Sequence, residues 1–530
     1  MKMLKQILIV LALFVQAVSA RDIVVFVHGL AGFGPDELGP IAYWQYRTRF
    51  PSSHFITYEA TVGPVSSNWD RACELYAQIK GTRVDYGKAH SDRYGHERYG
   101  KDYTGQGFYP SWSTSNRNIH LVGHSMGGMT IRLLEILLQE GDSDEQSETG
   151  SSTSPLFTGQ GNMIKSITTF STPHDGTPLV DQLDTVGILD IIENLILGFA
   201  GVSTFTPIDN LYDFDLDHWG IVQNEGESFS SYWNRVKNSN IFDEDNDDLA
   251  PFDLSPAGAK RLNDRGQQTY PNTYYFAYAT EQTWKDIFGY ANPEIDMWFF
   301  LHPFASLIGR NSNRDWRTND GLVPVESSQC PRNGNGYGGC TENRWWYSWQ
   351  PNRWYYEEKN YDHLQIIGFT FGYYFIVDNI YSDHAAKISR ISDSIPSLGI
   401  GVFDDETGGI TTTGIYVILA VTMMVGAMFV SAITYKRTRA TERLAKAMED
   451  YMTTPDERTA SVVLTEFANR RQSSVPSVFN SRRLSSIPSI FNSPKPRAGS
   501  ALESFSGSPT LSASNPAFGR KLPVVSEIEI

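Results

Sequence analysis

The segment at residues 118–140 constrains the fold of this chain more than any other. Residues 119–122 predict a short buried strand, and residues 130–138 place apolar side chains at helical spacing. Between them stands GHSMG, a Gly-x-Ser-x-Gly turn whose serine is Ser125. A strand, this turn and a helix in direct succession form the context that exposes a serine nucleophile at the edge of a parallel sheet. The segment therefore predicts an α/β fold with a reactive Ser125.

An upstream loop fits the same interpretation. Residues 22–27 predict an apolar strand that ends in His28-Gly29. In this type of fold, one backbone N–H of such a loop and the N–H of the residue after the nucleophile stabilise a negatively charged oxygen. We expect the N–H groups of Leu30 and Met126 to be these two donors.

The acid and the base of such a site follow the nucleophile in the order Asp or Glu, then His. Five histidines follow Ser125 in the chain, at positions 174, 218, 302, 363 and 384. Asp320 and His363 each stand in a polar stretch before an apolar run, so the order favours this pair. Order alone leaves the other histidines open, and Asp362 is the nearest competing acid.

Several long blocks carry a resemblance to a known family. They are VGPVSSNWDRACELYAQIKGTRVDYGKAH (62–90), STPHDGTPLV (171–180), YDFDLDHWG (212–220), GESFSSYW (226–233), NTYYFAYATE (272–281), NDGLV (319–323) and YDHLQIIG (361–368). From about residue 23 to 387 the chain resembles the thermoalkalophilic bacillus-type lipases, which are relatives of the staphylococcal lipases.

The resemblance implies one α/β-hydrolase domain at 21–408, with a mostly parallel central sheet flanked by helices. It places Ser125, Asp320 and His363 on the family's triad positions. It implies hydrolysis of acyl esters such as triacylglycerols. Phospholipid hydrolysis or acyl transfer by the same triad is one alternative, and a non-catalytic adhesion or receptor module on a hydrolase fold is another.

The same resemblance implies a structural zinc ion bound by an insertion at about 62–110. His-x5-His alone is weak support, but two imidazoles and two carboxylates make a closed tetrahedral set that suits structural zinc. The implied ligands are Asp70, His90, His96 and Asp253. The family also binds calcium just beyond the catalytic histidine. Calcium is doubtful here, because Gln365 and Thr370-Phe371 replace its acidic ligand and its Asp-Pro pair.

A lid is expected at about 180–210. Residues 186–205 are too apolar to lie exposed, and they occupy the position of the family's lid helix. Closed, this helix would cover Ser125; open at a lipid surface, it would expose a groove for an acyl chain. An ordinary buried helix is the alternative.

Both ends of the chain predict membrane targeting. Residues 1–20 have a basic start, an apolar stretch and a small-residue cleavage site, as in a signal peptide. Residues 415–435 carry no charge and are long enough for a transmembrane helix, and KRTR follows at once. We expect a single-pass type I protein of the secretory pathway, with its catalytic domain extracellular or lumenal.

The predicted cytoplasmic tail, residues 436–530, is rich in Ser and Pro and is expected to be mostly disordered. It repeats SVPSVFN as SIPSIFN and carries RRQS and RRLS, which suggest kinase or trafficking partners. Cys330 and Cys340 bracket a Gly-rich loop and suit a disulfide, whereas Cys73 is expected to be a buried thiol. A net charge of −16 argues against a nucleic-acid partner.

Overall fold

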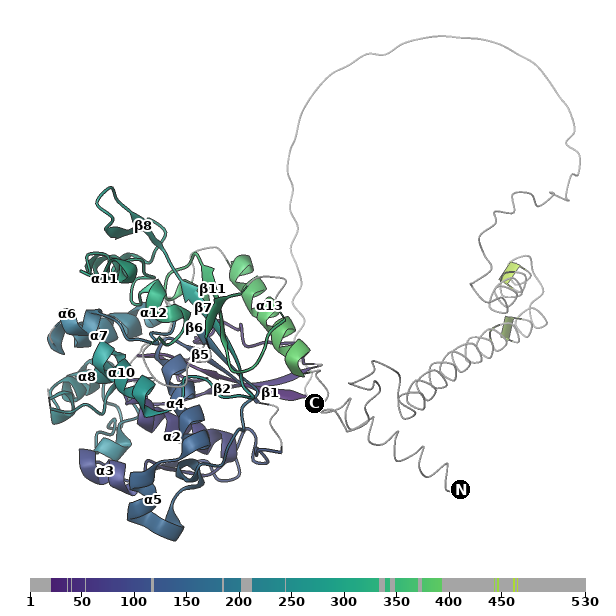
Figure 1. Ribbon diagram of the computed structural model, residues 1–530. Coiled ribbons are helices and arrows are strands. Elements are labelled where there is room, and N and C mark those ends of the chain that lie inside the picture. The colour runs from purple at the N-terminus through teal and green to yellow at the C-terminus, as the bar shows by residue number, and fades with distance from the viewer. Residues whose placement is uncertain are drawn as a thin grey trace, which may run out of the picture. The chain divides into compact units, whose positions relative to one another are not determined.

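A computed structural model shows the arrangement of the chain (Figure 1). It describes residues 21–392 without 36, 40, 53, 116–118, 184, 202–211, 244, 333–338, 344–347 and 370–373, and adds positions 443, 446, 447, 461, 462 and 465. Among these residues, no helix has both the length and the apolar character needed to cross a bilayer. The predicted signal peptide, the predicted span at 415–435 and almost all of the tail lie outside the described residues.

The chain divides into two units, Met1–Leu398 and Gly399–Ile530, and every element named below belongs to the first. Seven parallel strands form its central sheet in the order β10-β11-β7-β6-β5-β1-β2. These strands are β1 (Asp22–Val27), β2 (Phe55–Ala60), β5 (Ile119–His124), β6 (Ser166–Phe170), β7 (Tyr274–Thr280), β10 (Cys340–Glu342) and β11 (Trp354–Lys359). The predicted α/β class with a mostly parallel sheet is confirmed.

Helices cover both faces of the sheet because its strands are apolar on both faces. In β1, Val24 and Phe26 face one core, and Ile23, Val25 and Val27 face the other. The first core includes α7 (Thr185–Gly201), α8 (Phe229–Lys237), α11 (His302–Ile308) and α13 (Tyr374–Ser392). The second includes α2 (Asn68–Lys80), α4 (Met126–Glu140) and α10 (Pro256–Arg265).

Shorter elements complete the unit. Two small antiparallel pairs lie outside the central sheet, β3 (Arg83–Asp85) with β4 (Tyr99–Asp102) and β8 (Thr283–Lys285) with β9 (Ala291–Pro293). The remaining α-helices are α3 (Lys88–Tyr94), α5 (Ser143–Thr149), α6 (Leu179–Gln182), α9 (Ala250–Leu254) and α12 (Val325–Gln329). Single turns of 3₁₀-helix are η1 (Gly150–Ser152), η2 (Pro155–Thr158), η3 (Asp217–Trp219), η4 (Asn240–Phe242), η5 (Phe299–Leu301), η6 (Arg314–Trp316) and η7 (Gln365–Ile367).

The local predictions that follow from residue spacing agree with these elements. Strand β5 and helix α4 flank Ser125, and α7 forms within the apolar segment predicted as a lid. Cys330 and Cys340 are joined by a disulfide with Cα atoms 6.3 Å apart. Cys73 is a buried free thiol. Both cysteine predictions are confirmed.

Candidate active site and metal site

Ser125 stands on a strained turn between β5 and α4. Its φ of 55° and ψ of −129° lie in a region that non-glycine residues rarely adopt. The N–H of Ser125 donates to the carbonyl of Phe170 on β6, which fixes the turn against the sheet. A side chain at Gly123 would place its Cβ 2.4 Å from the N of Gly128, so the glycine is required for the strand and helix to meet.

The loop after β1 packs directly against this serine. A Cβ at Gly29 would lie 2.6 Å from the Cβ of Ser125 and 3.2 Å from its Oγ. Leu30, the next residue, lines the same cavity as Ser125. Met126 begins α4, and an N–H at that position has no acceptor inside its own helix. The two backbone groups predicted to bind a negatively charged oxygen therefore belong to segments that adjoin Ser125.

His363 and Asp320 are hydrogen-bonded to each other. The Nδ1 of His363 lies 2.9 Å from the Oδ2 of Asp320, and this oxygen also accepts from the Oγ1 of Thr280 at 2.7 Å. The Oδ1 of Asp320 accepts from the N–H groups of Leu322 and Val323. Both carboxylate oxygens of the buried Asp320 are thus held in place beside the imidazole of His363.

The structure brings the three predicted residues to one edge of the sheet. Ser125 follows β5 and His363 follows β11, at the carboxyl ends of these parallel strands. Asp320 lies 40 residues past Thr280, the last residue of β7, and is hydrogen-bonded to it. Ser125 and His363 line one cavity and are buried. Asp362 is turned elsewhere: its carboxylate accepts from the N–H groups of Trp298, Leu364 and Gln365, and burial raises its pKa to about 7.

The competing histidines have other partners. His174 lies against Thr169 and Arg132, and His384 lies between Thr168 and Tyr278. His302 donates to the carbonyl of Met297, and His218 lies beside Asp70. The geometry therefore separates His363 from the alternatives that chain order left open.

Helix α7 closes the cavity above Ser125. The volume is about 50 Å³, and Ile188, Ile191, Leu195 and Phe199 of α7 line it. Ligand pockets are about 300–1,000 Å³, so this space is small for an ester substrate.

Two buried side chains connect the parts of the site. The Tyr43 hydroxyl accepts from the N–H of Gly29 at 3.0 Å and donates to Nδ1 of His124 at 2.6 Å. The Nε2 of His124 donates to the carbonyl of His363 at 2.9 Å. Burial, with a smaller effect of the nearby His363, lowers the pKa of His124 well below its ordinary value, so the ring is neutral and its tautomer is set.

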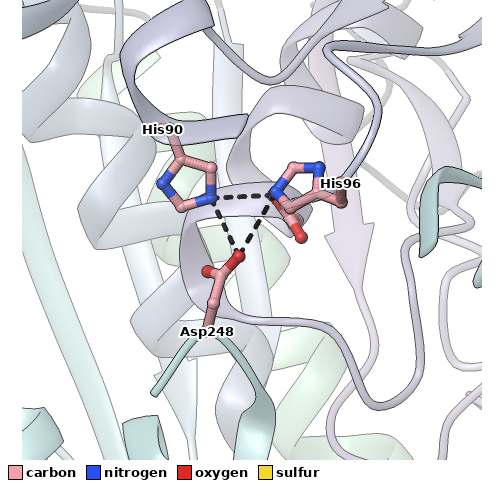
Figure 2. Close-up of side chains that lie close together, drawn as sticks. His90, His96 and Asp248 are labelled. Carbon is pink, nitrogen blue, oxygen red and sulfur yellow. Dashed lines mark hydrogen bonds and ion pairs between the residues drawn. The ribbon is translucent and has the colours of Figure 1, made fainter. Parts of the chain in front are cut away.

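A second group of polar side chains lies buried apart from this cavity. Asp70, His90, His96 and Asp248 each offer one ligand atom, and these atoms all lie within 4.8 Å of one another. The Nε2 of His90 is 3.0 Å from Oδ2 of Asp248 and 3.3 Å from Oδ1 of Asp70. Figure 2 shows His90, His96 and Asp248 turned toward one another.

The donor set fits a metal ion. The Oδ1 of Asp70 and the Nε2 of His96 are buried and have no hydrogen-bond partner among the described residues. The Nδ1 of His96 donates to the carbonyl of Glu97 at 3.0 Å, which leaves the Nε2 lone pair facing the group. Two imidazole nitrogens and two carboxylate oxygens are a ligand set that cations such as Zn²⁺ accept.

The ligand set expected from the sequence is wrong at one position, because Asp248 and not Asp253 joins the group. Asp253 lies inside α9, where its carboxylate accepts from the N–H of Asn68 at 2.6 Å and pairs with Arg261. It therefore caps the start of α2. Asp248 precedes α9, and pairing of Ser66 with Leu249 holds that segment beside α2.

His218 also belongs to this group of polar side chains, although the sequence did not predict it there. Its Nε2 lies 3.1 Å from the Oδ2 of Asp70, the oxygen that faces away from the other ligands. Burial alone would raise the pKa of Asp70, but the hydrogen bond from His218 and the nearby imidazole of His90 hold that pKa far below its usual range. The block YDFDLDHWG contained this histidine, but nothing in the sequence indicated which acid it contacts.

The position expected for calcium does not fit that ion. Gln365 donates from Nε2 to the carbonyl of Asp296 at 2.8 Å, and its Oε1 accepts from the N–H of Asp362. The amide is thus hydrogen-bonded through both atoms where a hard cation needs charged oxygen ligands. Thr370 and Phe371 lie outside the described residues.

Comparison with known proteins identifies the family. Residues 20–380 match the family model for the lipase-like C-terminal domain. The chain belongs to this lipase family. It is 39% identical to a lipase of Staphylococcus epidermidis over 360 residues, which are 66% of this chain and 50% of that protein. It is 38% identical over 361 residues to Lipase 1 of Staphylococcus aureus, covering 66% of this chain and 51% of that protein. The chain spans about half the length of the curated relatives it matches.

Solved lipase structures share the fold. The Staphylococcus hyicus lipase is 35% identical with a TM-score of 0.57, and the match covers 71% of this chain and 97% of that one. Lipase 1 of Pelosinus fermentans is 38% identical with a TM-score of 0.60, over 69% of this chain and 98% of that one. Because this second protein consists almost wholly of the shared region, the lipase-family unit folds without a counterpart of the remaining residues.

Proposed function

We propose that this lipase-family chain hydrolyses carboxylic esters through an acyl-enzyme formed on Ser125. The observation that carries the proposal is the ordered pair of His363 and Asp320, 2.9 Å apart, beside a cavity that also contains a serine on a strained turn. The names of the relatives support the same reaction.

In the proposed reaction, His363 takes the proton of the Ser125 hydroxyl as its oxygen attacks the ester carbonyl. His363 then gives that proton to the leaving alcohol, and water releases the acid by the reverse sequence. Asp320 keeps the imidazole in one tautomer and stabilises its positive charge. The N–H groups of Leu30 and Met126 are the proposed donors to the negatively charged oxygen, each worth about 3 kcal/mol.

The substrate we propose is an ester with a long acyl chain, such as a triacylglycerol. Apart from Ser125 and two histidines, the cavity is lined mostly by aliphatic and aromatic side chains, which suit an acyl chain and offer little to a charged group. Four of these side chains come from α7, so we propose that α7 acts as a lid that opens at a lipid surface.

We also propose that Asp70, His90, His96 and Asp248 bind a structural zinc ion. The support is the two unpartnered ligand atoms in a buried set of two nitrogens and two oxygens. When bound, the ion joins α2, α3 and the segment before α9, so its binding energy adds to the stability of the fold.

The proposed location rests on the sequence. A signal peptide at 1–20 and a membrane span at 415–435 would make the chain a single-pass type I protein, with the lipase-family unit extracellular or lumenal. Kinase or trafficking partners of the tail remain a proposal from its RRQS and RRLS sequences.

An activity profile over p-nitrophenyl esters of increasing chain length tests the proposal. We expect hydrolysis that favours long chains when the ester is emulsified and that disappears in Ser125→Ala. Undiminished hydrolysis by Ser125→Ala would refute the assigned nucleophile. Addition of glycerol and of phospholipid to the same assay separates acyl transfer and phospholipase activity from ester hydrolysis.

A further inference from the structure

The hairpin formed by β8 and β9, with the segment that follows it, exposes an unusual number of large apolar side chains. These are Trp284, Ile287, Phe288, Tyr290, Ile295 and Phe299, and they make up more than half of the exposed large apolar side chains among the described residues. Ile287 is 92% exposed and Ile295 is 97% exposed. In Figure 1 the hairpin projects from the body of the unit above α11.

The fold of the hairpin does not need these side chains. The carboxylate of Asp286 accepts from the N–H groups of Phe288 and Tyr290, and the N–H of Asp286 donates to the carbonyl of Tyr290. Gly289 supplies the positive φ of 77° that the turn requires. Backbone bonds to an acid and one glycine therefore close the turn, while Ile287 and Phe288 at its tip face solvent.

The turn of the hairpin is held by Arg317. The guanidinium of Arg317 lies over the ring of Tyr290 at 4.6 Å, and its Nη1 donates to the carbonyl of Gly289 at 3.0 Å. The Nε of the same guanidinium donates to the carbonyl of Asn311. The turn that carries the exposed tip is thus bonded to the body of the unit through Arg317.

The segment that follows the hairpin contacts helix α7, which lines the active-site cavity. Phe300, next to the exposed Phe299, contacts α7 at Gly198, where a Cβ would lie 3.2 Å from the Phe300 ring. Leu197, beside Gly198 on α7, is itself 46% exposed. An exposed apolar side chain of α7 thus lies beside the residue that Phe300 contacts.

We propose that this projection, residues 284–299, binds the unit to a lipid surface and thereby brings α7 close to that surface. This inference rests on the proposed function, because it concerns how the active site reaches a lipid substrate. The order of side chains favours lipid over a protein partner: Ile and Phe stand at the tip, and Trp284 and Tyr290, which suit the interfacial layer, stand behind them.

The chain that follows the described unit also favours a lipid surface as the binding partner of the projection. Residues 393–414 separate α13 from the uncharged stretch at 415–435. Fully extended, these 22 residues reach about 75 Å. With the proposed membrane span at 415–435, the unit would meet a bilayer at high local concentration, so that even a small apolar projection would suffice for docking.

Residues 21–398 allow a test without the predicted span, since a solved relative has the fold of this unit almost alone. Single cysteines can be placed specifically, because Cys73 is buried and Cys330 is bonded to Cys340. Ile287→Cys labelled with a nitrobenzoxadiazole dye should shift its emission to the blue on phosphatidylcholine vesicles. Val222→Cys, at an exposed apolar position outside the projection, should not.

The matched functional test uses Ile287→Ser with Phe288→Ser in one chain. We expect at least tenfold weaker sedimentation with vesicles and at least tenfold slower hydrolysis of an emulsified ester. Hydrolysis of soluble p-nitrophenyl acetate should stay within twofold, and Val222→Ser should match the unaltered unit in all three assays.

Equal vesicle binding by the double variant, or no binding by the unaltered unit, would overturn the docking surface. So would a concentration-dependent dimer that the double variant abolishes, because the projection would then meet a second copy. Vesicle binding that depends on Ile287 and Phe288, in a unit that hydrolyses no ester, would instead refute only the proposed function.

Discussion

The active-site cavity and the metal site are both buried, but they are assembled in different ways. Ser125 and His363 follow strands β5 and β11 of one sheet, and Asp320, although 40 residues past the end of β7, is hydrogen-bonded to the last residue of that strand. Parallel strand ends therefore hold all three residues together. The metal ligands come from α2, α3 and two loops, and only long-range packing brings Asp248 to the others. Residues fixed by a regular sheet are predictable from order, whereas those fixed by loops are not.

Removing the base should have the largest effect of any change at the strand-end site. We expect His363→Ala to lower kcat for ester hydrolysis by about 10⁶, as loss of the histidine base does in other serine hydrolases. His54→Ala, at an exposed histidine, is the matched control. A loss of less than tenfold in His363→Ala would show that the order of strand ends has selected the wrong base.

The metal site offers a direct comparison of two nearby acids. Asp248→Asn should weaken zinc binding at least 100-fold in a chelator competition, and Asp253→Asn should leave it within threefold. Chelation of the unaltered unit should lower its free energy of unfolding by at least about 3 kcal/mol. The opposite order of the two variants would restore Asp253 as the ligand.

Ser125 and this pair of acids show which site residues can be located from sequence patterns and which cannot. Strand β5, the turn and α4 are encoded within 22 residues by spacing and glycine, so the local pattern alone is enough to locate Ser125. Asp248 and Asp253 both lie in DDLAPFD, and the start of α9 between them decides which one reaches His90. The proline in the first turn of α9 is a local signal for that start. The pairing of Leu249 with Ser66, which holds Asp248 beside α2, is a long-range contact that no local pattern indicates.

No pattern in the sequence indicated the two side chains that connect the parts of the active site. Tyr43 and His124 lie 81 residues apart in the chain, and their contact follows from the path of the loop after β1. The projection at 284–299 shows the limit of judging burial from residue type. Ile287 and Phe288 are apolar residues of the kind found in cores, yet both lie exposed. Burial, unlike periodicity, is a property of the whole fold.

Tyr43→Phe tests whether the buried hydroxyl couples the loops of the active site. Without it the N–H of Gly29 and the Nδ1 of His124 lose their shared partner, which should cost about 1–3 kcal/mol of unfolding free energy. We expect kcat/KM for a soluble ester to fall about tenfold. Tyr46→Phe, at an exposed tyrosine, should change neither quantity.

A smaller effect is expected in the pH dependence of stability. Burial, with the nearby charge of Asp215, raises the pKa of Glu37 to about 7 from an ordinary value of 4.5. The folded state therefore holds this proton more tightly than the unfolded state, and the stability it supplies is present below about pH 4.5 and lost as the pH rises through about 7.

Urea unfolding at pH 5 and pH 8 checks this expectation. The unaltered unit should lose more stability between the two pH values than Glu37→Gln does, because glutamine keeps the acceptor for the N–H of Gly34 without a titrating proton. Glu225→Gln, at an exposed glutamate, should behave like the unaltered unit. Identical pH slopes for all three proteins would contradict the assignment.

The most direct test of the proposed catalytic site is covalent labelling with a fluorophosphonate, followed by peptide mass spectrometry. We predict one adduct, on Ser125, that forms in the unaltered unit, forms at least 100-fold more slowly in His363→Ala and is absent from Ser125→Ala. An adduct on another serine, or a folded unit that takes up no label, would contradict a catalytic site at these strand ends.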